Sequence, residues 1–179
     1  HVIKTLVKNL NEKDYDSLSE DEKVDLLTRI LDTKDSYSNQ YELLPDEQKL
    51  VVDVFKTMIL LREQVSKEAF GHYIISMTHD ASHVLEVMVL AKMAGLLGRT
   101  DDGRLFCDIL ITPLFETIDD LARIKNILEL IKNTPESKLR ILGIVFLIIG
   151  FLIIWYIKNW MSFLRKIFLG FIIISFSAL

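Results

Sequence analysis

Cysteine and clustered positive charge are scarce in this sequence. Its 179 residues include one cysteine, Cys107, so an internal disulfide is excluded. We therefore expect a reducing compartment and not a small secreted domain held by disulfides. Before Lys138 the chain carries a formal charge of −9 and has no basic cluster. Phosphate binding needs a clustered basic face, so nucleic acid is excluded as a partner.

A secretory signal is also missing. The first residue is His1, and no charged start followed by an apolar stretch precedes a cleavage site. We expect the sequence to begin within a longer protein. Cys107 lies in the apolar run LFCDILITPLF, so we interpret it as the packed thiol of a strand and assign it no catalytic role.

Apolar residues are concentrated at the C-terminal end. Half of the residues are hydrophobic, and the mean hydropathy of +0.30 is high for a soluble protein. From Lys138 onward the charged residues are all basic and give this part a charge of +5. We therefore divide the chain into a body over residues 1–135 and an apolar helical tail over residues 136–179.

Helical patterns dominate the first part of the body. Apolar residues three or four apart predict helices over residues 2–10, 20–31 and 46–66, the second capped by Ser19. The polar, turn-rich segment DTKDSYSNQYELLP at 32–45 is typical of a surface loop.

Two short β-branched segments, 72–78 and 107–115, predict strands buried on both faces. Each is followed by a helical pattern, over 82–97 and 116–133. This alternation predicts an α/β fold with an excess of helix, in which parallel strands are joined by helical crossovers. Two strands do not decide between an α/β barrel and a doubly wound sheet.

The predicted helix ends rest on particular residues. Asp80 or Ser82 would cap the helix that follows the first strand, and Gly95 or Gly98 would end it. Pro135 would stop the last helix of the body.

A long combination of motifs resembles a known family. The string FGHYIISMTHDASHVLEVMVLAKMAGLL, followed by ILITPLFETIDDL, is similar to the central region of phosphoenolpyruvate carboxylases, and YDSLSEDEKVDLLTRIL upstream is similar as well. The similarity covers about three quarters of the chain. It implies part of an incomplete α/β barrel in a mainly helical, cytoplasmic enzyme that is a homo-oligomer at full length.

The resemblance also implies a reaction. Enzymes of this family join phosphoenolpyruvate and bicarbonate to give oxaloacetate and phosphate, with Mg²⁺ or Mn²⁺, and so supply the citric acid cycle. Within PLFET, Glu116 occupies the position of a metal-ligand glutamate. Its place after a strand agrees, because catalytic groups of α/β barrels lie at the carboxyl ends of strands and hard cations bind carboxylates. The alternative is a carboxylate in a first helical turn, favoured by the helix dipole.

Several family features are missing. Ser82 is followed by His83 where the family usually has aspartate, which puts a polar contact there in doubt. The Gly-Tyr-Ser-Asp-Ser segment, the Gly-rich loop with its arginine, the amino-terminal His motif and the carboxyl-terminal arginines are absent. We therefore predict that the isolated chain does not catalyse carboxylation.

Two hypotheses account for the tail. Residues 141–157 are uncharged, and with residues 167–179 and the basic link between them they could form a transmembrane hairpin, so a membrane is a possible partner of residues 141–179. Alternatively, the tail is an AT-rich gene read out of frame, because the family pattern stops near Pro135; we favour this hypothesis. The transmembrane hairpin gives an alternative function: a small membrane-anchored helical protein whose acidic head binds a partner.

Other candidate sites are weaker. His79 and His83 are four residues apart, as in a zinc-binding H-E-x-x-H helix, but Asp80 replaces the glutamate and no third ligand is evident. Asp119 and Asp120 are adjacent on a helix and should point in different directions, which argues against an acid/base pair.

Overall fold

The computed structural model describes residues 1–132 and residue 160. The chain divides into two compact units, 1–141 and 142–179, and every element named below belongs to the first. The predicted tail, with its hairpin and out-of-frame interpretations, lies outside the described residues apart from Trp160.

Three α-helices precede the first strand, as the apolar spacing predicted. They are α1 (Val2–Asn9), α2 (Glu20–Asp32) and α3 (Asp46–Gln64). At the start of α2 the Ser19 hydroxyl accepts the Glu22 N–H at 3.3 Å, and the Ser19 N–H donates to the Glu22 carboxylate at 2.9 Å. This reciprocal capping box confirms Ser19 as the cap.

The segment predicted to be a surface loop over 32–45 is partly ordered and partly buried. It contains the short 3-10 helix η2 (Ser38–Leu43), and Tyr37 and Leu44 on either side of η2 lie in the core. A second 3-10 helix, η1 (Tyr15–Ser17), precedes α2. The prediction of a solvated loop is therefore wrong at Tyr37 and Leu44, because their apolar area is large enough to favour burial over exposure.

The predicted parallel strands are present in shorter form. β1 (His72–Ile75) and β4 (Leu110–Pro113) pair in parallel, with His72 opposite Leu110 and Ile75 opposite Pro113. The described residues thus form a helix-rich α/β chain with one parallel strand pair and no closed barrel.

The sequence predicted one strand over the apolar run 107–115, but the structure divides this run between two strands. Its first residue belongs to β3 (Leu105–Cys107), which pairs antiparallel with β2 (Leu97–Arg99) in a hairpin that the sequence analysis missed. Between β3 and β4 the Asp108 N–H donates to the Leu96 carbonyl at 2.8 Å. The run is divided because β3 pairs with β2 and β4 pairs with β1 in a separate sheet, so one straight strand cannot make both pairings.

The expectation that both faces of the strands are buried is wrong for β1. Tyr73 and Ile75 are half-buried against the core, whereas Ile74 is 60% exposed. Within the described residues only one face of β1 packs on the core. Successive side chains of a strand point to opposite faces, so Ile74 lies on the uncovered one.

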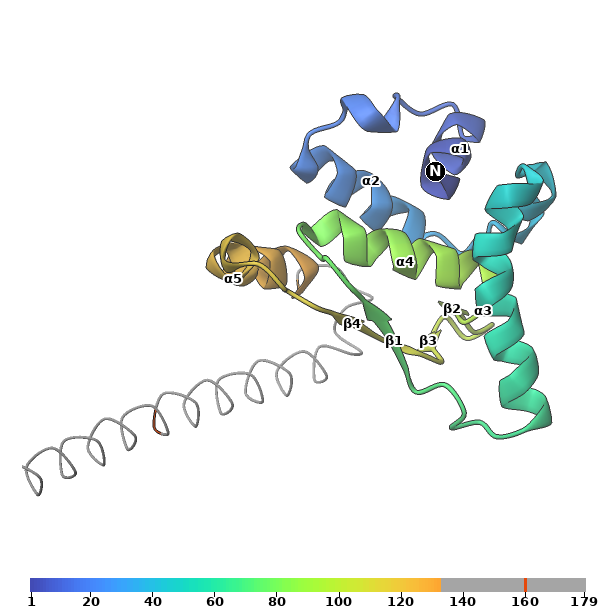
Figure 1. Ribbon diagram of the computed structural model, residues 1–179. Helices are drawn as coiled ribbons and strands as arrows, with labels where there is room; N and C mark the ends of the chain where they lie inside the picture. The colour runs from blue at the N-terminus through green and yellow to red at the C-terminus, as the bar shows by residue number, and fades with distance from the viewer. Residues whose placement is uncertain (133–159, 161–179) are drawn as a thin grey trace, which may run out of the picture. The chain divides into compact units, whose positions relative to one another are not determined.

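Helix α4 (Ala81–Ala94) occupies the centre of the described part. It contacts α1, α2, α3, β4 and α5 (Ile118–Lys132). Figure 1 shows α4 between α2 and the strand pair. Gly95 ends α4 with a φ of +95°, a left-handed conformation that favours glycine, as the sequence predicted.

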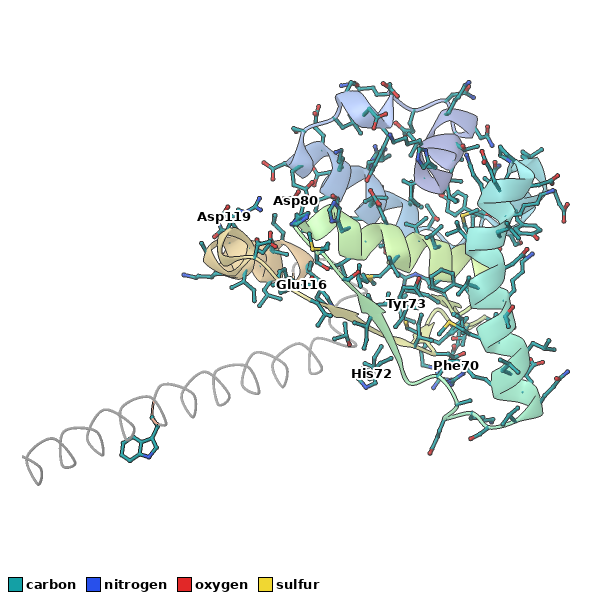
Figure 2. All side chains as sticks on the ribbon, viewed as in Figure 1. Phe70, His72, Tyr73, Asp80, Glu116 and Asp119 are labelled. Carbon is teal, nitrogen blue, oxygen red and sulfur yellow. The ribbon has the colours of Figure 1, made fainter. Side chains whose placement is uncertain are left out.

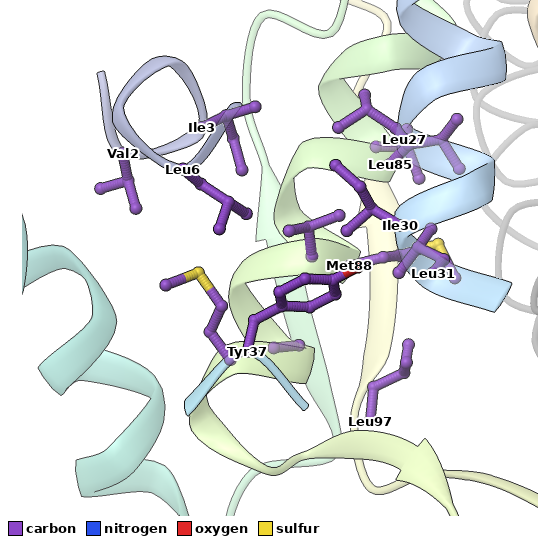
Figure 3. Packing of buried hydrophobic residues seen from close by; sticks show 14 of the residues in the cluster. Val2, Ile3, Leu6, Leu27, Ile30, Leu31, Tyr37, Leu85, Met88 and Leu97 are labelled. Atoms are coloured by element: carbon purple, nitrogen blue, oxygen red, sulfur yellow. The ribbon is translucent and has the colours of Figure 1, made fainter. Parts of the chain in front are cut away.

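The core is formed mainly between α2 and α4. Leu27 and Ile30 of α2 lie beside Leu85 and Met88 of α4 (Figure 3). Leu27 and Leu85 are fully buried, as expected for apolar residues three or four apart on facing helices.

One charged residue lies inside this core. The Lys92 side chain is 2% exposed, and its Nζ donates to the carbonyls of Ile30 and Leu31 at 2.8 Å and of Thr33 at 2.6 Å. These carbonyls belong to the C-terminal end of α2, where the helix carries partial negative charge. Lys92 therefore joins α4 to the end of α2.

Candidate metal site at the carboxyl ends of the strands

Two loops meet where the parallel strands end. The Leu114 N–H donates to the Ile75 carbonyl at 2.8 Å, and the Thr78 N–H donates to the Leu114 carbonyl at 3.1 Å. Thr78 is fully buried, and its hydroxyl donates to the Ile75 carbonyl at 3.2 Å. The loop between β1 and α4 is thus bonded to the loop between β4 and α5.

Glu116 lies in the second of these loops and is exposed. It comes three residues after the end of β4 and two before the start of α5, at the same end of the strand pair as Asp80 (Figure 2). Among the described residues its carboxylate has no hydrogen-bond or ion-pair partner. The acidic residues of the first turn of α5 are Asp119 and Asp120, so Glu116 precedes that turn and does not lie within it.

Thr117 and Asp120 cap the start of α5 reciprocally. The Asp120 carboxylate accepts the Thr117 N–H at 3.3 Å, and the Thr117 hydroxyl accepts the Asp120 N–H at 3.1 Å. This is a capping box built from threonine and aspartate. It fixes the residue that directly follows Glu116.

The Asp120 carboxylate also holds the first loop. Its side chain is 1% exposed, and Oδ1 lies 2.8 Å from His79 Nδ1 and 3.2 Å from the Arg123 guanidinium. Hydrogen bonds from Thr117 and then from His79 lower the pKa of Asp120 to about 2. Because the carboxylate is ionised at neutral pH, we assign the Nδ1 proton to His79 as the donor.

Asp119 and Asp120 have different surroundings, as their adjacent positions predicted. Asp119 is exposed, whereas Asp120 is buried under the first loop. A second and longer ion pair connects the first loop to α5, since the Arg123 guanidinium lies 3.5 Å from the Asp80 carboxylate.

The two histidines of the HDASH motif are not arranged to bind one metal ion. The backbone N–H of His79 donates to His83 Nδ1 at 3.4 Å, and the two rings have centroids 6.0 Å apart and planes inclined at 69°. His79 Nδ1 is already bonded to Asp120. His72, at the other end of the strand pair, is bonded through Nδ1 to the Thr112 hydroxyl at 3.1 Å (Figure 2).

The polar contact placed in doubt at the start of α4 is supplied by another helix. The Ser82 N–H and hydroxyl both donate to the Glu20 carboxylate, at 2.8 and 2.9 Å. Asp80 occupies the predicted N-cap position, but its side chain makes no capping hydrogen bond. Glu20 takes that role from the first turn of α2, and no local sequence signal identifies a partner 62 residues away.

Cys107 is half-buried at the end of β3, and its thiol donates to the Ile109 carbonyl at 3.2 Å. This position agrees with a packed strand thiol.

A divalent metal fits this region only as a partial site. Mg²⁺ commonly takes one or two protein carboxylates and fills its remaining positions with water and substrate phosphate. Glu116 offers one exposed carboxylate of that kind. Residues 1–132 and Trp160 contain no group of three or more His, Cys, Asp or Glu side chains that could hold an ion.

The helices that the structure describes include none long and apolar enough to cross a membrane.

The family model and the three relatives named here have the same description. Residues 1–144 match the family model for phosphoenolpyruvate carboxylase. The phosphoenolpyruvate carboxylase of Aliivibrio salmonicida is 38% identical over 132 residues, which cover 72% of this chain and 13% of the relative. That of Prochlorococcus marinus strain MIT 9312 is 37% identical over 121 residues, and that of Synechococcus strain WH7803 is 34% identical over 121 residues.

These two alignments cover 64% and 68% of this chain, and 11% and 12% of the relatives. The chain therefore spans about a ninth to an eighth of the length of the curated relatives that it matches. The family model and these relatives show that the chain belongs to the phosphoenolpyruvate carboxylase family.

Proposed function

We propose that this segment supplies one metal-binding carboxylate, Glu116, to an enzyme that carboxylates phosphoenolpyruvate with bicarbonate to give oxaloacetate and phosphate. The observation that carries the proposal is the position of Glu116. Its side chain is exposed at the carboxyl end of a parallel strand and lacks a partner among the described residues. Structural carboxylates in this region, such as Asp120, are instead buried and bonded.

The chain's own residues would act by holding this carboxylate in place. The Glu116 oxygens would provide one hard ligand to Mg²⁺ or Mn²⁺. When bound, the ion would stabilise the negative charge of an enolate and orient the phosphate and carboxylate groups. The hydrogen bonds among Ile75, Thr78 and Leu114 would keep the backbone of Glu116 at the carboxyl end of the strands.

The isolated chain should not turn over substrate, in our proposal. A metal site needs further ligands, and the Gly-rich loop with its arginine and the carboxyl-terminal arginines of the family are absent from this sequence. We place the complete enzyme in the cytoplasm as a homo-oligomer, as the family resemblance implies. The incomplete barrel also belongs to this proposal, with β1 and β4 as two neighbouring strands of it.

Paramagnetic broadening tests the metal role without requiring activity. Substoichiometric Mn²⁺ is added to the isotopically labelled full chain, and backbone amide signals are followed by nuclear magnetic resonance. We expect selective broadening at Glu116 and Thr117, because a lone carboxylate binds weakly but places the ion close to these amides. Glu116→Gln should abolish the broadening. The matched control Asp119→Asn, also at an exposed carboxylate near the start of α5, should retain it. Broadening that is absent, or that survives Glu116→Gln, would rule out the assigned role.

Activity is tested in a complete enzyme. Residues 1–132 replace the matching segment of the Aliivibrio salmonicida relative, and the Mn²⁺ concentration for half-maximal oxaloacetate formation is measured. Glu116→Gln in this chimaera should raise that concentration at least roughly tenfold, the scale expected when a metal site is disturbed. Asp119→Asn should leave it within about twofold. Bicarbonate-dependent phosphate release by the 179-residue chain alone would contradict the predicted inactivity.

A further inference from the structure

Glu116 lies between two fixed points of the backbone. On one side, Leu114 exchanges hydrogen bonds with Ile75 and Thr78 of the first loop, and Phe115 is packed against the core. On the other side, Thr117 is held by the capping box with Asp120. The orientation of Glu116 therefore depends on how firmly Thr117 is held.

The hold on Thr117 depends in turn on the first loop. Asp120 lies in α5, but its Oδ1 atom contacts His79, which is 41 residues earlier in the sequence and directly precedes the N-cap of α4. The same carboxylate thus binds His79 through one oxygen and the Thr117 N–H through the other. A single buried group connects the β1–α4 loop to the residue after Glu116.

We propose that His79 and Asp120 are positioning residues for Glu116, and that their hydrogen bond fixes the Glu116 carboxylate in the orientation needed for a divalent cation. The metal part of this inference rests on the proposed function. The positioning part does not, because it concerns the backbone of residues 116–117 in the absence of metal. Neither residue touches substrate or metal in this account.

Other contacts near Glu116 are weaker candidates for this role. The pair formed by Arg123 and Asp80 is longer, at 3.5 Å, and both side chains are about half exposed, so solvent screens it. The bond between His79 and Asp120 is short, and its carboxylate is buried. The bond from His79 also orients the Asp120 carboxylate, because contacts at both of its oxygens fix the plane of the group.

Conservative and disruptive variants of His79 separate positioning from general stability. His79→Ala removes the donor, whereas His79→Asn places an amide N–H close to the position of Nδ1 and should restore the bond. His72→Ala is the matched control, because His72 also makes a side-chain hydrogen bond through Nδ1, to Thr112 of β4, but lies at the opposite end of the strands. These three variants and the unchanged full chain are compared by amide hydrogen exchange and by Mn²⁺ broadening.

In His79→Ala we expect amide exchange at Thr117 to rise roughly tenfold while core amides such as Leu85 change little, as for a local opening. The Mn²⁺ concentration that half-broadens the Glu116 signal should rise about threefold or more, by the same loss of preorganisation. His79→Asn should lie within about twofold of the unchanged chain in both measurements, and His72→Ala should not affect Thr117 selectively.

The outcomes distinguish the two proposals. Unchanged exchange at Thr117 in His79→Ala overturns the positioning role, even if Glu116→Gln abolishes broadening. Faster exchange throughout the chain, or no recovery in His79→Asn, also overturns it, because the pair would then be a general stabilising contact. If Glu116→Gln leaves the broadening unchanged while His79→Ala loosens Thr117 selectively, the metal role fails and the positioning of the loop stands.

Discussion

The ammonium nitrogen of Lys92 lies 2.8 Å from the carbonyl oxygen of Ile30, inside the interface between α4 and α2. The same nitrogen reaches the carbonyls of Leu31 and Thr33. The C-terminal carbonyls of a helix lack intrahelical donors, so an adjacent helix supplies a cation to satisfy them.

Lys92→Met should destabilise the chain strongly. The substitution keeps the aliphatic stem but leaves buried carbonyls without a charged donor, which should lower the free energy of unfolding by roughly 2–4 kcal/mol. Urea denaturation followed by circular dichroism measures the change. Lys67→Met, at an exposed position, should stay within about 0.5 kcal/mol. Equal effects of the two substitutions would contradict the capping role of Lys92.

Gly95→Ala should destabilise through the backbone. Gly95 has a φ of +95°, and an added Cβ would meet only Ile59 Cδ1, at an ordinary 3.9 Å. The cost is therefore conformational and should be about 1–2 kcal/mol. Gly71→Ala is the matched control, because its added Cβ would meet nothing within 4 Å and it lies outside the positive-φ region. Thermal unfolding that ranks Gly71→Ala as the more damaging change would contradict this explanation.

Glu20 and Ser82 should be energetically coupled. The Glu20 carboxylate accepts both the N–H and the hydroxyl of Ser82, so removal of either side chain weakens the start of α4. A double-mutant cycle of Glu20→Gln and Ser82→Ala should give a coupling free energy of about 1 kcal/mol. Additive effects of the two substitutions in urea denaturation would show that the contact contributes nothing.

Acid should weaken the chain in part through Asp120. Its pKa is lowered from 3.8 to about 2 in the folded state, first by Thr117 and then by His79. A carboxyl group whose pKa is lower in the folded state stabilises the fold at pH values above its unfolded pKa. This stabilisation is lost as the pH falls from about 4 to about 2.

Asp120→Asn should therefore reduce the slope of stability against pH in this interval, although the variant is less stable at pH 7. The urea midpoint measured at several pH values between 2 and 5 checks this. Asp119→Asn serves as the exposed control and should keep the slope of the unchanged chain. An unchanged slope in Asp120→Asn would mean that its hydrogen bonds do not favour the ionised form.

The helices were predictable because their signals are local. Ser19 with Glu22 marks the start of α2, and Gly95 marks the end of α4, and both act through neighbours within a few residues. The parallel pairing of β1 and β4 followed from the alternation of strand and helix. The family motifs placed Glu116 after a strand, and its side chain does lie exposed beyond the carboxyl end of β4.

The hairpin of β2 and β3 was not predictable in the same way. Its strands have three residues each, which is too short for an alternating pattern to be distinguished from a loop. Asp108 is the single charged residue in the apolar run from Leu105 to Phe115, and one polar residue is too weak a signal to divide the run into two strands. Tertiary pairing, and not local pattern, decided this boundary.

The network around Glu116 was missed because its members are far apart in the sequence. His79 was considered as a zinc ligand and Asp120 as half of an acid/base pair with Asp119, yet His79 and Asp120 are bonded to each other across 41 positions. Glu20 and Ser82 are separated by 62 positions. Contacts of this range depend on the packing of α4 against α2 and α5, which single-residue chemistry does not specify.

The strand pair has an implication for handling the protein in solution. Each of its two members, in the part of the chain that the structure describes, lacks a strand along its outer side. Unsatisfied backbone donors and acceptors along such a margin attract any extended peptide, including another molecule of the same kind. Preparations should consequently associate more as they are concentrated, and a Lys or Pro introduced at Ile74 should keep them dispersed.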